Sequence, residues 1–336
     1  MSSSISKTLS VVFSFLLVHS AICFEFNISR FNPSANDVPY EGDAKATDGA
    51  IQLTSPHYSS HVGRVTYNPK IRLWDSGSGK LAHFTTHFQF TINTLGRPYG
   101  NYSAGLAFFM APVGFQIPVN SVGGFLGLFN TTDNNSSKNQ IIHVEFDTFV
   151  NPEWDPNYEH VGINKNSIAS SVTTPWNVTY HSGDPIRARI DYNASTMNLS
   201  VSWSSRTMAH PHESTSLWYK IDPRTVLPEW VVVGVSAETG IYIEEHTLHW
   251  WDFQSSLPVE EPSGGHRKRV GLILGLTILL GAMVAALALL IMRRRKQKRM
   301  EKLAEMTMPT SNNDDFEKRP GPRKFPYQDL DSTTNN

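Results

Sequence analysis

The 336-residue sequence contains a single cysteine, Cys23, at the end of an apolar N-terminal stretch. The residues that follow it therefore offer no thiol for a disulfide framework, a cysteine nucleophile or a cysteine-zinc site. A domain without such cross-links must be stable through core burial or bound metal. Apolar residues make up 40% of the chain and aromatic residues 11%, which is enough for a full globular core.

Basic residues are scarce in the long segment between the two apolar ends of the chain. Residues 24–266 carry 14 Lys and Arg against 23 Asp and Glu, a net charge of −9, although the whole chain has a net charge of −1. A nucleic-acid partner requires a basic surface that displaces counterions from phosphates. The acidic segment therefore excludes nucleic acid as the expected partner.

Residues 1–23 have the features of a secretory signal peptide. Lys7 supplies a positive charge, residues 9–18 form an apolar core, and residues 21–23 resemble a cleavage site. We expect the mature chain to be exported and free of cysteine. Eight Asn-x-Ser/Thr acceptors for N-glycosylation follow, and none occurs after residue 198: Asn27, Asn101, Asn130, Asn134, Asn135, Asn177, Asn193 and Asn198.

Short β-branched and aromatic runs alternate with Gly, Pro and Asn clusters through residue 257. The runs that predict strands most clearly are residues 83–92, 106–111, 141–149, 187–192, 199–203 and 230–237. No amphipathic helical window of useful length occurs before residue 265. Many short strands with frequent turns indicate one all-β domain, a sandwich or barrel, over residues 24–257.

A linker at residues 258–269 leads to an uncharged apolar run at residues 270–292. A helix of this length crosses the roughly 30 Å of membrane hydrocarbon. Six basic residues follow the run closely, whereas three precede it, so the positive-inside bias places the C-terminus in the cytoplasm. The sequence therefore predicts a single-pass type I plasma-membrane protein, with an extracellular domain and a disordered cytoplasmic tail at residues 293–336.

Polar side chains that could bind metal are concentrated between residues 145 and 160. Alternation along a predicted strand places two of them, Glu145 and Asp147, on one face together with Phe149, while Val144, Phe146 and Thr148 face the core. Neighbouring carboxylates on one face repel each other unless a cation lies between them. A solvated edge strand would account for the Glu-x-Asp pair alone, but not for all the potential ligands.

The remaining ligands, Asn151, Asp155 and His160, follow on a Pro-containing loop that can fold back over the strand. Asp, Asn and main-chain oxygens suit calcium, whereas a set that adds Glu and His suits a transition ion such as manganese. Three other histidines lack ligand spacing to a second group, so we expect surface or packing roles for His143, His246 and His249.

Ordered motifs over nearly all of residues 24–257 resemble those of the legume-lectin family. Besides the acidic segment, they include residues 24–27, 63–65, 105–112, 123–129, 233–240 and 251–253. The resemblance implies a two-sheet jelly-roll sandwich with adjacent calcium and manganese sites. By matching positions, it implies calcium ligands from Asp147, the main-chain oxygen of Phe149, Asn151 and Asp155. The implied manganese ligands are Glu145, Asp147, Asp155 and His160.

The same resemblance implies a shallow sugar site beside the calcium. The Asn151 side-chain amide and the Gly124 main-chain amide would bond the sugar, and the Phe149 ring would face its C–H surface. Residues 241–244, with Ile241 and Tyr242, occupy the loop that sets specificity in such lectins. Ala104 departs from the family, which usually has there an Asp that accepts bonds from two sugar hydroxyls. The departure predicts weak or altered glycan binding, or a ligand that is not a sugar.

Two enzymatic alternatives lack the residues that they need. Retaining glycosidases on related jelly rolls use Glu-x-Asp-x-x-Glu, and Val150 occupies the position of the last glutamate. The arrangement also resembles plant L-type lectin receptor kinases, including a tail at residues 321–330 like the segment that leads into their kinase domain. No kinase phosphate loop or catalytic motif follows it in this sequence, so we expect no enzymatic activity.

The sequence therefore predicts a membrane-anchored, carbohydrate-binding, receptor-like protein. Its expected partners are a glycan and the membrane, with a kinase-bearing receptor for any signalling and self-association left open. The alternative is a sugar-silent ectodomain that binds a protein, peptide or small apolar ligand and acts as a co-receptor or decoy.

Overall fold

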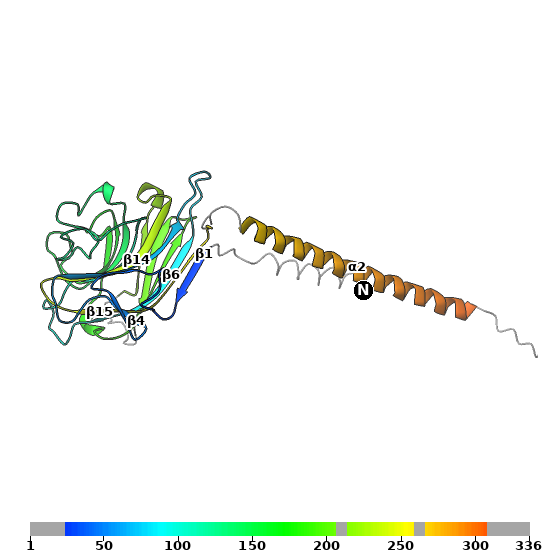
Figure 1. The fold of residues 1–336 in the computed structure, drawn as a ribbon, viewed down its shortest axis with the longest axis horizontal. Coiled ribbons are helices and arrows are strands. Elements are labelled where there is room, and N and C mark those ends of the chain that lie inside the picture. Colours follow the sequence, from blue (N-terminus) through cyan, green and yellow to red (C-terminus); the bar gives the residue numbers. More distant parts are fainter. Residues whose placement is uncertain (1–23, 206–213, 259–265, 308–336) are drawn as a thin grey trace, which may run out of the picture. The chain divides into compact units, whose positions relative to one another are not determined.

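The computed structural model describes residues 24–205, 214–258 and 266–307, with the side chains of the last segment described from residue 280 to residue 304. The predicted signal peptide, most of the predicted linker and the predicted tail beyond residue 307 lie outside the described residues. The chain divides between Glu260 and Glu261 into two compact units, a β domain and a helical segment (Figure 1).

The β domain consists of two antiparallel sheets. The eight-stranded sheet has the order β13 (Ser216–Lys220), β12 (Asn198–Ser204), β11 (Ile186–Asn193), β6 (Phe84–Asn93), β15 (Glu245–Ser255), β4 (Ala50–Gln52) and β3 (Lys45–Thr47), and β1 (Phe24–Ile28) also pairs with β15. The seven-stranded sheet has the order β10 (Val172–Pro175), β9 (His160–Lys165), β8 (Ile142–Asp147), β7 (Gly105–Pro112), β14 (Trp230–Thr239), β5 (His61–Arg72) and β2 (Tyr40–Gly42). This arrangement confirms the predicted all-β sandwich.

All six of the clearest predicted strands are present, with ends that differ by a few residues. Within residues 24–205 and 214–258 the helical elements are three single 3₁₀ turns, η1 (Ser137–Asn139), η2 (Val178–Tyr180) and η3 (Pro223–Thr225). Strand β6 illustrates why the pattern is reliable, because burial alternates strictly along its ten residues. An alternating strand has one face toward the core and one toward solvent.

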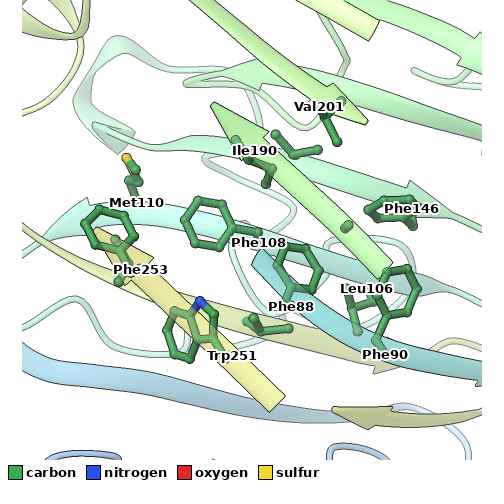
Figure 2. Close-up of a cluster of buried hydrophobic side chains, with 14 of the residues drawn as sticks. Phe88, Phe90, Leu106, Phe108, Met110, Phe146, Ile190, Val201, Trp251 and Phe253 are labelled. Atoms are coloured by element: carbon green, nitrogen blue, oxygen red, sulfur yellow. The ribbon is translucent and has the colours of Figure 1, made fainter. Parts of the chain in front are cut away.

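The main core lies between the two sheets and is rich in aromatic side chains (Figure 2). Phe88 and Phe90 of β6 and Trp251 of β15 meet Phe108 of β7 and Phe146 of β8 there, and all are almost fully buried. The Phe90 and Phe146 rings, from opposite sheets, have centroids 4.8 Å apart and tilted planes. These contacts pack the two sheets against each other.

Strand β8 lies inside its sheet, paired with β7 on one side and β9 on the other. Val144 and Phe146 face the main core, as predicted. Its opposite face is covered by a second apolar cluster that includes Phe125, Leu126 and Phe129 from the loop after β7. Both faces of β8 are therefore buried, which rules out the solvated edge strand.

The helical segment is a single helix, α2 (His266–Thr307), and it includes the predicted apolar span. The helix continues through residues 293–307, so the prediction of a disordered tail is wrong for that part of the chain. No helix among the described residues is both long and apolar enough to cross a membrane. The first ten residues of the predicted span, 270–279, have side chains outside the described part of the chain.

We predict that Phe88→Ala destabilises the β domain by about 3–5 kcal/mol, because it leaves a cavity between the sheets. The matched control is Trp218→Ala on edge strand β13, where the side chain is 64% exposed and the change should stay within about 0.5 kcal/mol. Urea unfolding of residues 24–257 measures both values. Equal effects of the two substitutions would contradict this description of the core.

Candidate functional site

Three potential metal ligands converge at one end of strands β8 and β9. One ligand atom each from Asp147, Asp155 and His160 lie within 4.8 Å of one another. Asp147 and His160 are directly paired across the two strands, so their side chains share one face. Asp155 comes from the intervening loop, which therefore folds back over that face as predicted.

Hydrogen bonds fix the acidic loop between the two strands. The Asn151 N–H donates to Asp155 Oδ2 at 2.7 Å, and the Asp155 N–H donates to the Asn151 carbonyl at 2.9 Å. Asp147 Oδ1 accepts from the Phe149 N–H at 2.8 Å. Backbone amides of the acidic loop thus hold the carboxylates of Asp147 and Asp155 in place.

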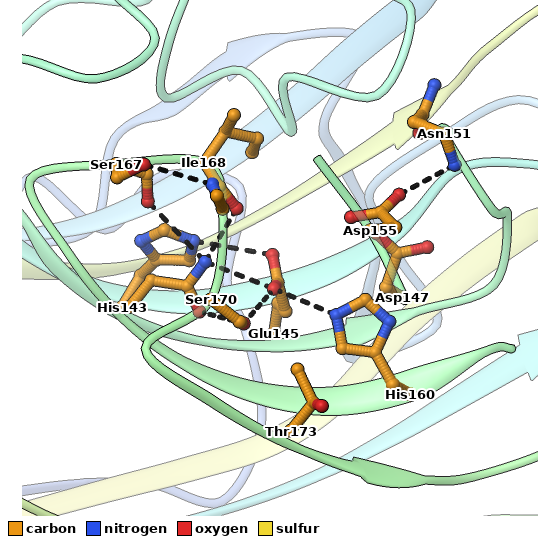
Figure 3. Close-up of polar contacts among 12 residues, drawn as sticks. His143, Glu145, Asp147, Asn151, Asp155, His160, Ser167, Ile168, Ser170 and Thr173 are labelled. Carbon is orange, nitrogen blue, oxygen red and sulfur yellow. Dashed lines mark hydrogen bonds and ion pairs between the residues drawn. The ribbon is translucent and has the colours of Figure 1, made fainter. Parts of the chain in front are cut away.

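Glu145 lies beside this cluster and has its own set of partners (Figure 3). Its Oε1 lies 3.2 Å from His160 Nε2 and accepts from Ser170 Oγ at 2.6 Å. Asn164 Nδ2 also donates to this oxygen, at 3.1 Å. Its Oε2 lies 3.4 Å from His143 Nε2. Two histidines therefore flank one buried carboxylate, and the packing role expected for His143 includes a contact with Glu145.

Burial and mutual repulsion perturb the acidic groups strongly. Burial raises the pKa of Asp147 well above its usual range, and the nearby carboxylates of Asp155 and Glu145 raise it further. Burial also raises the pKa of Asp155 to about 7. Glu145 behaves differently, because its contacts with His143 and His160 overcome the effect of burial and lower its pKa. The same contact with Glu145 raises the pKa of His160.

The donor atoms of this cluster fit a divalent cation. Buried atoms without a hydrogen-bond partner among the described residues include Asn151 Oδ1 and His160 Nδ1. Buried polar atoms nearly always have partners, so an unpaired oxygen next to two crowded carboxylates points to a missing positive charge. Carboxylate and amide oxygens suit calcium, and the histidine nitrogen extends the set toward a transition ion.

The residues expected to contact a sugar lie on or beside the acidic loop. Gly124 lies against Asn151, since a Cβ built on Gly124 would be 2.5 Å from Asn151 Oδ1. The Phe149 and Tyr242 rings have centroids 6.2 Å apart, and Ile241 next to them is 70% exposed. Ala104 is buried and its carbonyl accepts from the Thr148 N–H at 3.4 Å. The structure therefore brings the predicted recognition residues together.

The Gly124 main-chain N–H was expected to be free to donate to a sugar, and in the structure it is not. It donates instead to Oε1 of Glu238, at 2.9 Å. Glu238 is a residue whose importance the sequence did not reveal, although a charged residue near the end of the apolar run at residues 230–237 was a visible signal.

A second carboxylate that the sequence did not single out, Glu244, connects residues 241–244 to the segment that begins the acidic loop. Thr148 Oγ1 donates to Glu244 Oε1 at 2.6 Å, and His246 Nε2 lies 3.0 Å from the same oxygen. Glu244 and His246 are fully buried, and Thr148, expected in the core, faces this network instead. Ser103 Oγ secures the same loop by donating to the Tyr242 carbonyl at 3.2 Å.

The candidate glycosylation sites are all accessible to some degree. Four of the asparagines are exposed, Asn27, Asn101, Asn135 and Asn193, and the other four are half-buried, Asn130, Asn134, Asn177 and Asn198. His249, the remaining histidine with an expected surface or packing role, lies half-buried beside Thr91.

We predict that cation uptake releases protons below neutral pH. With a pKa of about 7, about nine-tenths of Asp155 is protonated at pH 6 and about one-tenth at pH 8, and bound metal requires the ionised form. Metal affinity should therefore fall as the pH falls through 7. Calorimetric titration with calcium in buffers of different ionisation enthalpy measures the release. Equal proton release at pH 6 and pH 8 would contradict the raised carboxylate pKa.

Comparisons with known proteins agree with this geometry. An L-type lectin-domain containing receptor kinase of Arabidopsis thaliana, IX.1, is 43% identical over 333 residues, which cover 97% of this chain and 50% of the relative. The chain thus spans about half the length of that relative. Lectin II from Ulex europaeus has a TM-score of 0.64 and 37% identity, covering 70% of this chain and 99% of that structure. A structure of lectin UEA-II complexed with galactose has a TM-score of 0.63 and 36% identity, covering 70% and 99%.

The family model described as "Legume lectin domain" matches residues 23–268, which include the whole β sandwich and the acidic loop. This match describes a carbohydrate-binding, legume lectin-like domain. The two-sheet fold, the metal-ligand cluster and these matches together show that the chain belongs to the legume lectin family.

Proposed function

We propose that this chain is a membrane-anchored, receptor-like protein that binds glycans at a site organised by calcium and manganese. The observation that carries the proposal is the buried cluster of Asp147, Asp155 and His160, with ligand atoms within 4.8 Å. We infer that the acidic loop, which carries Asp155, presents Asn151 and Phe149 to a ligand. Neutralising the cluster would fix that loop, and a fixed loop binds a ligand at lower entropic cost.

The two ions would share the ligands Asp147 and Asp155 and would differ in their other ligands. Calcium would be held by Asp147, the main-chain oxygen of Phe149, Asn151 and Asp155. Manganese would be held by Asp147 and Asp155 together with Glu145 and His160. The ions would supply positive charge that offsets the repulsion between the buried carboxylates.

The recognition surface combines one polar group with an apolar rim. The Asn151 side chain has an amide that can donate to a sugar hydroxyl, and Phe149 and Tyr242 offer ring faces for the C–H surface of a sugar. Ala104 supplies no acceptor for a hydroxyl. A hydrogen bond to a charged group contributes about 1.5–3 kcal/mol, so we infer weak binding of single sugars.

The case for membrane anchoring rests on the sequence, because the described part of helix α2 is not by itself long and apolar enough to cross a membrane. The helix includes the uncharged run at residues 270–292, and its described apolar side chains, among them Leu280, Met283, Val284 and Leu287, are exposed. An exposed apolar surface of this extent favours a lipid or protein environment over water. The six basic residues between positions 293 and 299 would face the cytoplasm. The receptor-kinase relative suggests that signalling involves a kinase-bearing partner.

We predict that glycan binding by residues 24–257 depends on metal. Chelation with EDTA should abolish the signal on a glycan array, and added calcium and manganese should restore it. Asp155→Asn, which keeps the shape and removes the charge, should weaken glycan binding by roughly tenfold to a hundredfold. The control, Glu153→Gln, changes an exposed carboxylate of the same loop and should leave binding intact.

A chelator-resistant glycan signal would contradict the metal-organised site. Complete silence of the metal-loaded protein on the array would contradict carbohydrate binding itself.

We predict that the full chain, expressed in plant cells, stays in the membrane pellet after alkaline carbonate extraction. A chain truncated after residue 257 is the matched control, and it should be secreted into the medium. Recovery of the full chain in the carbonate supernatant would contradict membrane anchoring.

A further inference from the structure

One buried carboxylate, Glu238, accepts hydrogen bonds from several backbone amides of the loop that lies against Asn151. Glu238 is on β14 and is fully buried. Its Oε1 accepts from the Gly124 N–H at 2.9 Å and also from the Gly123 N–H, and its Oε2 accepts from the Leu126 N–H at 2.6 Å. Among the described residues it has no ion-pair partner, so these amides are its main source of stabilisation.

The loop is held on its other sides by contacts that do not need Glu238. Ser236 Oγ donates to the Leu126 carbonyl at 2.6 Å. The Phe125 ring packs on Trp154 of the acidic loop, with centroids 5.2 Å apart. Changing the carboxylate should therefore alter the direction of the Gly123 and Gly124 amides without detaching the loop.

The two glycines can adopt more than one orientation of their peptide groups. Gly123 and Gly124 have φ values of 90° and 95°, in the region that glycine visits without a steric penalty. An N–H group that donates to a carboxylate inside the protein is not free to donate to a ligand outside it. Glu238 therefore selects the inward orientation of the Gly124 amide.

We propose that Glu238 determines the specificity of this recognition surface, an inference that rests on the proposed glycan-binding function. The surface lacks an acceptor at Ala104 and a free donor at Gly124, so it has no donor and acceptor pair for adjacent sugar hydroxyls. Recognition then rests on the Asn151 amide and on the apolar surface of Phe149, Tyr242 and Ile241. The favoured ligands are sugars that present a C–H face and a single hydroxyl.

A double-mutant cycle between residues 104 and 238 tests this inference. The four proteins are residues 24–257 as the parent, Ala104→Asp, Glu238→Ala and the double variant, each saturated with calcium and manganese. Calorimetry measures their affinities for methyl α-galactoside and methyl α-mannoside. We expect Glu238→Ala, added to Ala104→Asp, to tighten binding of at least one glycoside about tenfold, since a donor and an acceptor then act on the same sugar.

Two measurements separate the role of Glu238 in specificity from a role in folding. Hydrogen exchange of the Gly123 and Gly124 amides should become faster in Glu238→Ala, while calcium uptake stays at the parent level. If Glu238→Ala loses calcium uptake, Glu238→Gln replaces it in the cycle, because glutamine keeps the volume and loses one acceptor. The control Glu25→Ala removes an exposed carboxylate on β1 and should change neither measurement.

The outcomes distinguish the inference from the proposed function. If Ala104→Asp binds a glycoside and the change at residue 238 adds nothing or weakens it, the role of Glu238 in specificity is contradicted. If no protein in the cycle binds any glycoside or array glycan, the proposed function fails and this inference fails with it.

Discussion

The buried carboxylate of Asp147 and the half-buried carboxylate of Asp155 lie close together at the end of strand β8, and the proposed recognition surface depends on how their mutual repulsion is relieved. Burial raises the pKa of both groups, because an ionised carboxylate loses its hydration in the protein interior. Backbone amides of the acidic loop offset only part of this cost. A divalent cation is the simplest source of the missing positive charge, and Asn151 and His160 offer further ligand atoms.

Short, direct contacts connect the acidic cluster to the neighbouring loops. Asn151 belongs to the acidic loop and also lies against Gly124, so the loop that would bind metal supports the loop held by Glu238. On the other side, Thr148 connects the same segment to Glu244 of the specificity loop. Three segments distant in sequence thus converge on one small region. A change in the charge of the cluster should therefore affect ligand binding more than global stability, which depends on the core between the sheets.

The local pattern of the sequence predicted an all-β domain and the acidic loop, and the resemblance to legume lectins predicted a sandwich rather than a barrel. Alternating apolar and polar residues in β6 and β8 made their strands visible, and the Pro-containing loop that carries Asp155 was expected to fold back over the strand. The partners of Glu238 and Glu244 were not predictable in the same way. Each of these carboxylates accepts a hydrogen bond from a group distant in sequence, Gly124 or Thr148, and only the packing of loops on the sheet brings them together. The direction of the Gly124 amide likewise depends on a φ angle that the residue type leaves free.

The central claim is that divalent cations neutralise the buried acidic cluster. Anomalous diffraction at the manganese edge, from crystals of residues 24–257 grown with calcium and manganese, tests it most directly. The account predicts a manganese peak bounded by Glu145, Asp147, Asp155 and His160, beside a second density for calcium contacting Asn151. Protonated carboxylates in direct contact, with no anomalous peak among these residues, would contradict it.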